Sequence, residues 1–281
     1  MRELGTPVLD NHLHLDRSAR GIEAVKDFAR SGGTHLLVVN KPSWHLGTEV
    51  ETGADFRAGF EETRSLVEDA TETLPGRAWA VLGVHPALIS RLVDDRGFEP
   101  EKAADLMKAG LTVAGEYASR GEAVALKSGR PHYDVEEAVW EAANEVLRHA
   151  LAVAAEADVA VQLHTEQTAD LSEVGKWAEQ RGLDATRVVK HYSAGELAGV
   201  TPSVMSRKDY LETALEADDP FLMETDFVDD PDRPGAVMGP RTVPRRVNWL
   251  LKNGHDEAVE CAHVETPRRI YGIDTRDSLD R

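Results

Sequence analysis

The segment that most constrains the fold of this chain is residues 10–16, which read Asp-Asn-His-Leu-His-Leu-Asp. Side chains alternate along a β-strand, so His12 and His14 share a face and can bind one metal ion from a single rigid element. The apolar neighbours Leu9 and Leu15 indicate that this strand is buried, and a buried imidazole needs a partner. The pair predicts a metal site if later strands supply more ligands; otherwise the two histidines only line a surface strand.

Apolar runs alternate with helical segments along the rest of the chain, and about eight such runs are present. After the opening strand, the strands that we predict cover residues 34–39, 78–84, 123–127, 159–163, 187–190, 203–205 and 221–226. The helices that we predict cover residues 22–30, 55–74, 100–120, 135–157, 171–181, 242–252 and 256–271. This alternation predicts an α/β fold, a parallel (β/α)8 or TIM barrel, as one domain over residues 1–281. A doubly wound open sheet is the alternative, and it is less favoured because no glycine-rich phosphate loop follows any strand.

The composition indicates a cytoplasmic protein with a sizeable core. Hydrophobic residues make up 41% of the chain, and no segment is long and apolar enough to cross a bilayer. The N-terminus lacks the basic and then apolar arrangement of a signal peptide, so we expect a cytoplasmic location. The single cysteine, Cys261, excludes an intrachain disulfide and a cysteine-based zinc cluster, and we expect it to pack within a helix.

Polar side chains that can bind metals lie at or near the C-terminal ends of many of the predicted strands. They are His12, His14, His85, Lys127, His164, His191 and Asp226. In a parallel barrel these strand ends meet on one face, so residues far apart in the chain become neighbours in one pocket. A single histidine at such a place is more often a structural hydrogen-bonding residue than a metal ligand. Several on separate strands, together with an aspartate, are difficult to explain by structure alone.

These residues resemble the motifs of the TatD-related metal-dependent hydrolases of the amidohydrolase superfamily, in their archaeal type. The matching motifs are residues 10–16, Gly-Val-His-Pro at 83–86, His164, His191 and Glu-Thr-Asp at 224–226. The resemblance implies a barrel with one or two divalent metal ions, with zinc as the first choice and manganese or magnesium as alternatives.

The resemblance also implies how the ligands are shared between the ions. His12, His14 and Asp226 would hold the more buried ion, and His164 and His191 would hold the second. A bound divalent ion lowers the pKa of water toward neutrality and so supplies a nucleophile. Asp226 would hold this water and accept its proton, which makes it the residue that we expect to be least replaceable.

The chain departs from the family pattern at Lys127, where members usually carry a glutamate that bridges the two metals. The residues at 129–133, Gly-Arg-Pro-His-Tyr, resemble archaeal-type members and fix the alignment. Two dications would repel an unmodified ammonium strongly. Three interpretations stay open: Lys127 reacts with carbon dioxide to form an anionic carbamate, it stays cationic and replaces one metal, or the site is degenerate. We favour the carbamate because both histidines of the second metal site are present.

Further candidates surround the predicted metal ligands. His85 either contacts the substrate or anchors the turn at Pro86. Arg130 and His132 lie in the loop after the fourth strand and are candidates to bind an anionic substrate group, unless Arg130 pairs with an acidic residue of the protein.

Two acidic residues are predicted to support the site from behind, and a third is assigned another role. Glu224 lies two residues before Asp226 and can orient a ligand histidine, and Asp10 bears the same relation to His12. Asp16 falls just past the strand, so we predict that it caps the following segment.

The sequence therefore predicts a metal-dependent hydrolase, whose first candidate substrate is a phosphoester such as the end of a DNA strand. A lactone or amide hydrolase with a carboxylated Lys127 is the alternative, and a non-catalytic binding or structural barrel is the second alternative. A nuclease needs aromatic and basic residues on the strand-end loops. Few are apparent: Trp44 with Lys41, and Arg233 with Arg241. No membrane or protein partner is indicated.

The formal net charge of −18 and the low lysine content, nine of 32 basic residues, suggest adaptation to a salty cytoplasm. They also argue against non-specific nucleic-acid binding, since no basic run neutralises phosphates. We expect the thermal unfolding temperature to rise as potassium chloride increases from about 0.1 M to about 1 M, because the Debye length falls from about 10 Å to about 3 Å. Unfolding curves measured across this range check the hypothesis, and a protein equally stable in dilute buffer would contradict it.

Overall fold

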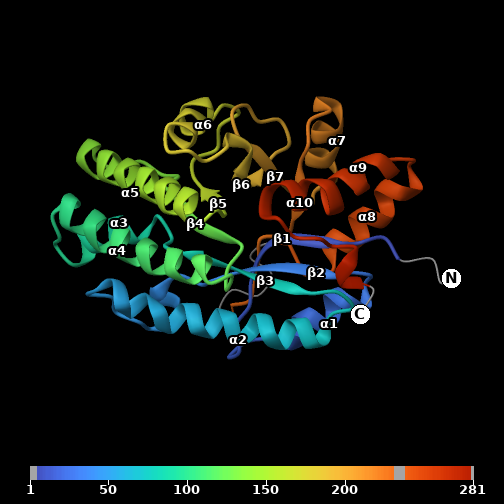
Figure 1. Ribbon diagram of the computed structural model, residues 1–281, viewed down its shortest axis with the longest axis horizontal. Helices are drawn as coiled ribbons and strands as arrows, with labels where there is room; N and C mark the ends of the chain where they lie inside the picture. The colour runs from blue at the N-terminus through green and yellow to red at the C-terminus, as the bar shows by residue number, and fades with distance from the viewer. Residues whose placement is uncertain (1–4, 231–237, 280–281) are drawn as a thin grey trace.

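The computed structural model describes residues 5–230 and 238–279, and its strands form one curled parallel sheet with helices around it (Figure 1). The strands are β1 (Leu9–His14), β2 (His35–Val39), β3 (Ala78–Gly83), β4 (Ala125–Gly129), β5 (Ala160–His164), β6 (Val188–Ser193), β7 (Thr201–Met205), β8 (Leu222–Glu224) and β9 (Phe227–Val228). Their order in the sheet is β8-β7-β6-β5-β4-β3-β2-β1-β9. Each strand from β1 to β7 thus pairs with the next in the chain, as in a (β/α)8 barrel.

Helices follow the strands and cover the outside of the sheet (Figure 1). They are α1 (Ile22–Arg30), α2 (Arg57–Thr73), α3 (Leu88–Ser90), α4 (Pro100–Ser119), α5 (Glu137–Glu156), α6 (Ser172–Glu179), α7 (Lys208–Ala217), α8 (Thr242–Lys252), α9 (Asp256–Glu260) and α10 (Thr266–Tyr271). Short 3-10 helices cover Ser43–Leu46, Gly53–Phe56, Ala185–Arg187 and Asp277–Leu279, and π-helical turns cover Arg91–Asp95 and Cys261–Glu265. No helix in the described ranges is long and apolar enough to cross a membrane.

The barrel closes through an eighth strand that is interrupted in its middle. β8 pairs with β7 and β9 pairs with β1, and only Thr225 and Asp226 separate β8 from β9. The backbone N–H of Asp226 donates to the carbonyl of His12 at 3.0 Å, which continues the pairing with β1. Asp226 has a φ of +47°, an uncommon conformation for a residue other than glycine, so the break turns the chain at this point.

The barrel interior has an apolar layer below a polar layer. Apolar side chains from most strands pack together here, among them Leu9, Leu37, Val81, Ala125, Ala160, Val189 and Leu222. Side chains two residues apart share a face of a strand, so the next inward positions are Lys127, Gln162, His191 and Glu224. Ile270 and Tyr271 of α10 belong to the apolar cluster. The strands therefore present polar groups only toward their C-terminal ends.

Strands β3 and β4 approach each other unusually closely beside Lys127. The N–H of Val84 donates to the carbonyl of Lys127 at 3.0 Å. A Cβ at Gly83 would lie 2.0 Å from that same carbonyl oxygen, so only glycine fits there. This contact fixes the backbone from which the Lys127 side chain enters the barrel.

The structure confirms the predicted barrel and defines the secondary structure of three of its segments more closely. The strand predicted over residues 203–205 is present as β7, in which Pro202 is buried. The predicted helix over 256–271 is instead α9, a π-helical turn and α10, and the half-buried Cys261 begins that turn. The segment between residues 40 and 53, which lies in none of the predicted strands or helices, contains 3-10 turns.

Candidate metal centre

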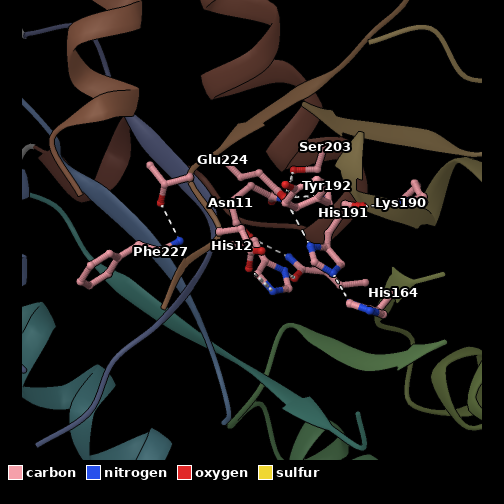
Figure 2. Close-up of polar contacts among 12 residues, drawn as sticks. Asn11, His12, His164, Lys190, His191, Tyr192, Ser203, Glu224 and Phe227 are labelled. Atoms are coloured by element: carbon pink, nitrogen blue, oxygen red, sulfur yellow. Dashed lines mark hydrogen bonds and ion pairs between the residues drawn. The ribbon is translucent and has the colours of Figure 1, made fainter. Parts of the chain in front are cut away.

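The predicted site residues come together at the C-terminal ends of the strands, where Figure 2 shows His12, His191 and His164 in one group. His12 and His14 lie on β1, His164 ends β5, and His191 lies on β6. The remaining predicted residues are Lys127 on β4, His85 just after β3, and Asp226 at the break between β8 and β9. Each of these side chains is buried or half-buried.

Three of these residues form a set that can hold a metal ion. One ligand atom from each of His12, His191 and Asp226 lies within 4.8 Å of the other two. The rings of His12 and His191 stack with centroids 4.1 Å apart and an angle of 9°. Nε2 of His12 lies 3.8 Å from the Asp226 carboxylate. Imidazole nitrogens and a carboxylate oxygen are a common donor set for zinc and manganese.

This grouping differs from the predicted division of ligands between two ions. His14 lies at the edge of the set. Its ring is edge-on to that of His12, with the ring centroids 5.2 Å apart, and its Nδ1 is hydrogen-bonded to the carbonyl of Val39 at 2.9 Å. Nδ1 of His164 lies 2.7 Å from Nε2 of His191, so these two histidines are hydrogen-bonded directly. His191 therefore faces both His12 and His164, and it can belong to either metal position.

The electrostatics of the site keep the histidines neutral. Burial lowers the pKa of His12, His14 and His191, and the charge of Lys127 lowers it further. Burial also lowers the pKa of His164, with the neighbouring His85 as the next cause. A neutral imidazole keeps a lone pair on one ring nitrogen, which is the form that binds metals.

Lys127 lies inside the site, 2% exposed, with Nζ 3.3 Å from Nε2 of His12. Burial lowers the pKa of Lys127 from 10.5 to about 7, although Asp226 and Glu224 raise it. Burial raises the pKa of Asp226 to about 6, and Lys127 and then Lys190 lower it. The ammonium and the carboxylate thus stabilise each other's charge in a region where either charge alone would be costly.

Gln162, which was not among the residues predicted from the sequence, lies behind His12. Nδ1 of His12 donates to Oε1 of Gln162 at 2.7 Å, and Gln162 is fully buried. The Gln162 amide donates to the carbonyl of Asn11 at 2.8 Å and to the Tyr271 hydroxyl at 3.1 Å, which fixes its orientation. Because an amide oxygen only accepts, the proton stays on Nδ1 and Nε2 faces the site with its lone pair. Its position two residues before His164 on one strand is the signal that could have indicated it.

Asp10 does not orient the His12 ring, so this prediction is wrong. Its carboxylate accepts hydrogen bonds from the backbone N–H and hydroxyl of Thr225, at 3.0 and 2.6 Å, and from the backbone N–H of His12. Asp10 lies two residues before His12 on β1. Its carboxylate reaches across to the eighth strand, where it contacts Thr225, the residue before Asp226. Asp10 therefore holds the strand break, while Gln162 holds the imidazole.

Glu224 lies behind His191, at the place predicted for a carboxylate that orients a ligand. Its Oε1 is 3.4 Å from Nδ1 of His191 and accepts the backbone N–H of Tyr192 at 2.7 Å. The hydroxyl of Ser203 donates to its other oxygen. Burial raises the pKa of Glu224 well above its usual range. The orienting role itself stays a prediction.

The residues predicted to bind substrate lie in different surroundings. The buried Arg130 guanidinium forms an ion pair with Glu166 and a hydrogen bond with Asn144 at 3.2 Å. This is the alternative given above, in which Arg130 pairs with an acidic residue of the protein. His132 is exposed, and its Nδ1 lies 2.9 Å from Nε2 of His164. His132 thus borders the site, whereas the charge of Arg130 is neutralised by the protein.

His85 anchors the turn at Pro86, and its contact with a substrate stays a prediction. Its Nδ1 accepts the backbone N–H of Ala87 at 3.2 Å, which anchors the turn after β3. Its ring packs 4.6 Å from that of His164 and 5.6 Å from that of Trp44. The side chain therefore connects the turn to the histidines of the site.

Two of the three basic residues named as nucleic-acid contacts, Lys41 and Arg241, are paired within the protein. Lys41 is buried and lies 2.6 Å from the carboxylate of Asp16. Asp16 also accepts the backbone N–H of Ser18 in the turn before α1, whereas α1 itself has no side-chain cap. Arg241 pairs with Asp27 at 2.6 Å. Arg233 lies outside the described residues. The described strand-end loops thus contribute little free positive charge from these residues.

Comparison with known proteins identifies relatives over nearly the whole chain. The sequence model of the family described as TatD related DNase matches residues 9–272. An uncharacterised protein of Methanocaldococcus jannaschii, MJ1127, is 33% identical over 287 residues, which cover 95% of this chain and 96% of that protein.

Solved structures share the fold. A TatD homologue from Escherichia coli, YJJV, has a TM-score of 0.65 and 19% identity, over 95% of this chain and 98% of its own. The organophosphorus hydrolase from Deinococcus radiodurans has a TM-score of 0.56 and 15% identity, over 96% of this chain and 93% of its own. At these identities the similarity concerns the fold alone.

We expect Gln162→Met to weaken the binding of zinc or manganese by roughly 10- to 100-fold, because His12 loses the acceptor that holds its ring and its proton. Isothermal titration of the metal-free protein measures this change. Ser128→Ala is the matched control, since this buried hydroxyl has no hydrogen-bond partner among the described residues. Equal affinity in Gln162→Met and the unaltered protein would show that Gln162 does not orient His12.

Proposed function

This chain belongs to the TatD-related DNase family, and from that premise we propose that it hydrolyses phosphoesters, with nucleic-acid ends as the first candidate substrate. The observation that carries the proposal is the set of His12, His191 and Asp226 at the C-terminal mouth of a parallel barrel. This face is where barrel enzymes of many kinds place their catalytic residues. The family assignment makes the chain a hydrolase, and the substrate is the proposal.

The residues present fit a divalent metal ion. Neutral imidazoles and a carboxylate converge, and the Gln162 hydrogen bond leaves Nε2 of His12 facing the set. His12, His191 and Asp226 would hold one ion, and His14 and His164 are the adjacent donors for a second. A divalent ion there supplies a Lewis acid and lowers the pKa of water. Zinc is our first choice, with manganese or magnesium as alternatives.

Asp226 is the residue that we propose as proton acceptor. Its φ of +47° and its backbone hydrogen bond to His12 hold the carboxylate beside Nε2 of His12, in a site otherwise formed by neutral or cationic nitrogen groups. A carboxylate in this position can hold a water molecule and accept its proton. His85 and His132 lie farther out, where a leaving group or substrate would pass.

We expect Asp226→Asn to lower turnover of a phosphodiester by about 10²- to 10⁴-fold, since an amide cannot accept the proton. Initial rates on methyl p-nitrophenyl phosphate and on a short DNA strand measure the loss, with chelator treatment and metal readdition in parallel. The matched control is Asp219→Asn, an exposed residue away from the site. Full turnover by metal-loaded Asp226→Asn would refute the assignment.

A lactone or amide hydrolase is the second candidate, and Lys127 is the observation that favours it. A lysine on the fourth strand resembles other branches of the superfamily, in which it carries a carbamate between two metals. The same rate measurements with a lactone and an amide compare the candidates. A chain that binds no metal under any loading would instead support a non-catalytic barrel.

Lys127 determines how many ions we expect the site to hold. If its buried amine reacts with carbon dioxide, releasing one proton, the resulting carbamate supplies the missing anionic bridge. We expect bicarbonate to raise the metal content of the unaltered protein toward two ions per chain. Lys127→Glu, which restores the usual family residue, should reach two ions without bicarbonate. Metal analysis after equilibrium dialysis measures both.

Electron density from a metal-loaded crystal soaked in bicarbonate tests the same proposal directly. Density that ends at the amine of Lys127 would contradict the carbamate and favour a cationic lysine that replaces one metal.

A further inference from the structure

Two exposed tyrosines border the metal site. Tyr133 and Tyr192, 41% and 39% exposed, are the large hydrophobic side chains that lie open to solvent in the described part of the chain. Each directly follows a histidine of the site, His132 or His191. Figure 2 shows Tyr192 next to His191. Large apolar side chains left exposed at the mouth of a polar site are candidates for ligand contact.

The two tyrosines lie at the ends of a continuous row of aromatic rings. Ring centroids along this row are separated by 5.2 Å from Tyr133 to His132, 4.9 Å from His132 to His164, 4.9 Å from His164 to His191 and 6.4 Å from His191 to Tyr192. The histidines of the row lead to the metal set, of which His191 is a member. A substrate bound over the histidines therefore has an exposed ring on each side.

The protein holds the Tyr133 side chain and the Tyr192 backbone in place. The Tyr133 hydroxyl donates to the hydroxyl of Ser90 at 2.9 Å. The backbone N–H of Tyr192 donates to Glu224 at 2.7 Å, and its carbonyl accepts from Gln167 at 3.3 Å. Tyr192 also has a φ of +58°, which is rare for a bulky residue. Restricting either residue in this way reduces the conformational freedom that it loses when a ligand stacks on its ring.

Space for a planar group lies beside the first tyrosine. A hollow of about 260 Å³ adjoins Tyr133 and His132, and Trp140 and Glu166 also line it. A planar base can enter this hollow with the Tyr133 ring as one wall. Aromatic walls accept every base, because each base has a π face.

The charge distribution favours contacts with bases over contacts with phosphates. The chain has a formal net charge of −18, and Arg130 and Lys41 near the site are paired with Glu166 and Asp16. Phosphate-based binding depends on unpaired basic residues and on counterion release. A protein with this charge can hold a nucleic-acid strand better through stacking.

We propose that Tyr133 and Tyr192 stack on two bases of a single-stranded nucleic-acid end, one on each side of the phosphate at the histidines. This inference rests on the proposed phosphoesterase function and specifies its substrate as a strand with accessible bases. Stacking of this kind tolerates any base sequence, so the enzyme would select strand ends by their unpaired bases.

The test uses Tyr133→Ala and Tyr192→Gly, the latter because glycine adopts a positive φ without strain. Binding of a short fluorescent single strand is measured by anisotropy in chelator. An otherwise identical strand that lacks its last bases is the second probe. We expect each variant to lose on the order of 10-fold in affinity for the normal strand. We expect variant and parent to bind the base-free strand alike.

Three further variants serve as controls. Tyr133→Phe and Tyr192→Phe keep the rings and should bind the normal strand within about 2-fold of the parent, because stacking needs the ring and not the hydroxyl. Tyr210→Ala removes a half-buried tyrosine on α7 and should leave affinity unaltered. Thermal unfolding of every variant verifies that it is folded.

The outcomes separate this inference from the proposed function. Unaltered affinity in both ring-removing variants, or an equal loss on the normal and base-free strands, would overturn stacking. Metal-dependent cleavage of methyl p-nitrophenyl phosphate that Asp226→Asn abolishes would still support the phosphoesterase in that case. No phosphodiester cleavage under any metal loading would instead refute the proposed function, whatever the tyrosines bind.

Discussion

The hydrogen bonds between Asp10 and Thr225 hold the place where the eighth strand breaks, and both the barrel closure and the metal set depend on them. Asp10 accepts both the backbone N–H and the hydroxyl of Thr225, and that hydroxyl accepts the N–H of Phe227 at 3.1 Å. A positive φ at Asp226 costs about 1–3 kcal/mol. Burial raises the pKa of Asp10 to about 7, so each of its hydrogen bonds contributes about 0.5–1.5 kcal/mol when the carboxyl is neutral and about 1.5–3 kcal/mol when it is ionised. The bonds can therefore offset the strain and keep the Asp226 carboxylate beside His12.

Lys127 is the second constraint, because one charge decides what the rest of the site can bind. Two unit charges 4 Å apart interact by about 4 kcal/mol at an effective dielectric constant of 20, and a dication doubles this value. The Lys127 ammonium interacts with Asp226 and with the lone pair of His12. A metal on the same donors would repel it, so metal binding and the chemical state of Lys127 must be linked.

The described basic side chains that the sequence suggested as nucleic-acid or substrate contacts are paired with acidic residues of the protein. This pairing limits how the surface around the site could bind a polyanion. Internal ion pairs neutralise Arg130, Lys41 and Arg241, while two tyrosine rings stay open beside the histidines. Recognition by rings is less sensitive to salt than recognition by charge.

The sequence by itself determined the barrel and the strands that carry the candidate ligands, because hydrophobic periodicity and strand alternation are local properties of the chain. His12, His164, His191 and Asp226 were placed at strand ends for this reason. Only the tertiary structure decided which of them meet, since the register between strands and the break at Asp226 set the distances across the barrel. Local sequence patterns likewise could not predict the hydrogen-bond and ion-pair partners of the buried polar groups. Gln162 rather than Asp10 supports His12, and Glu166 neutralises Arg130, because each pair joins residues from separate strands or loops that become neighbours only when the barrel closes.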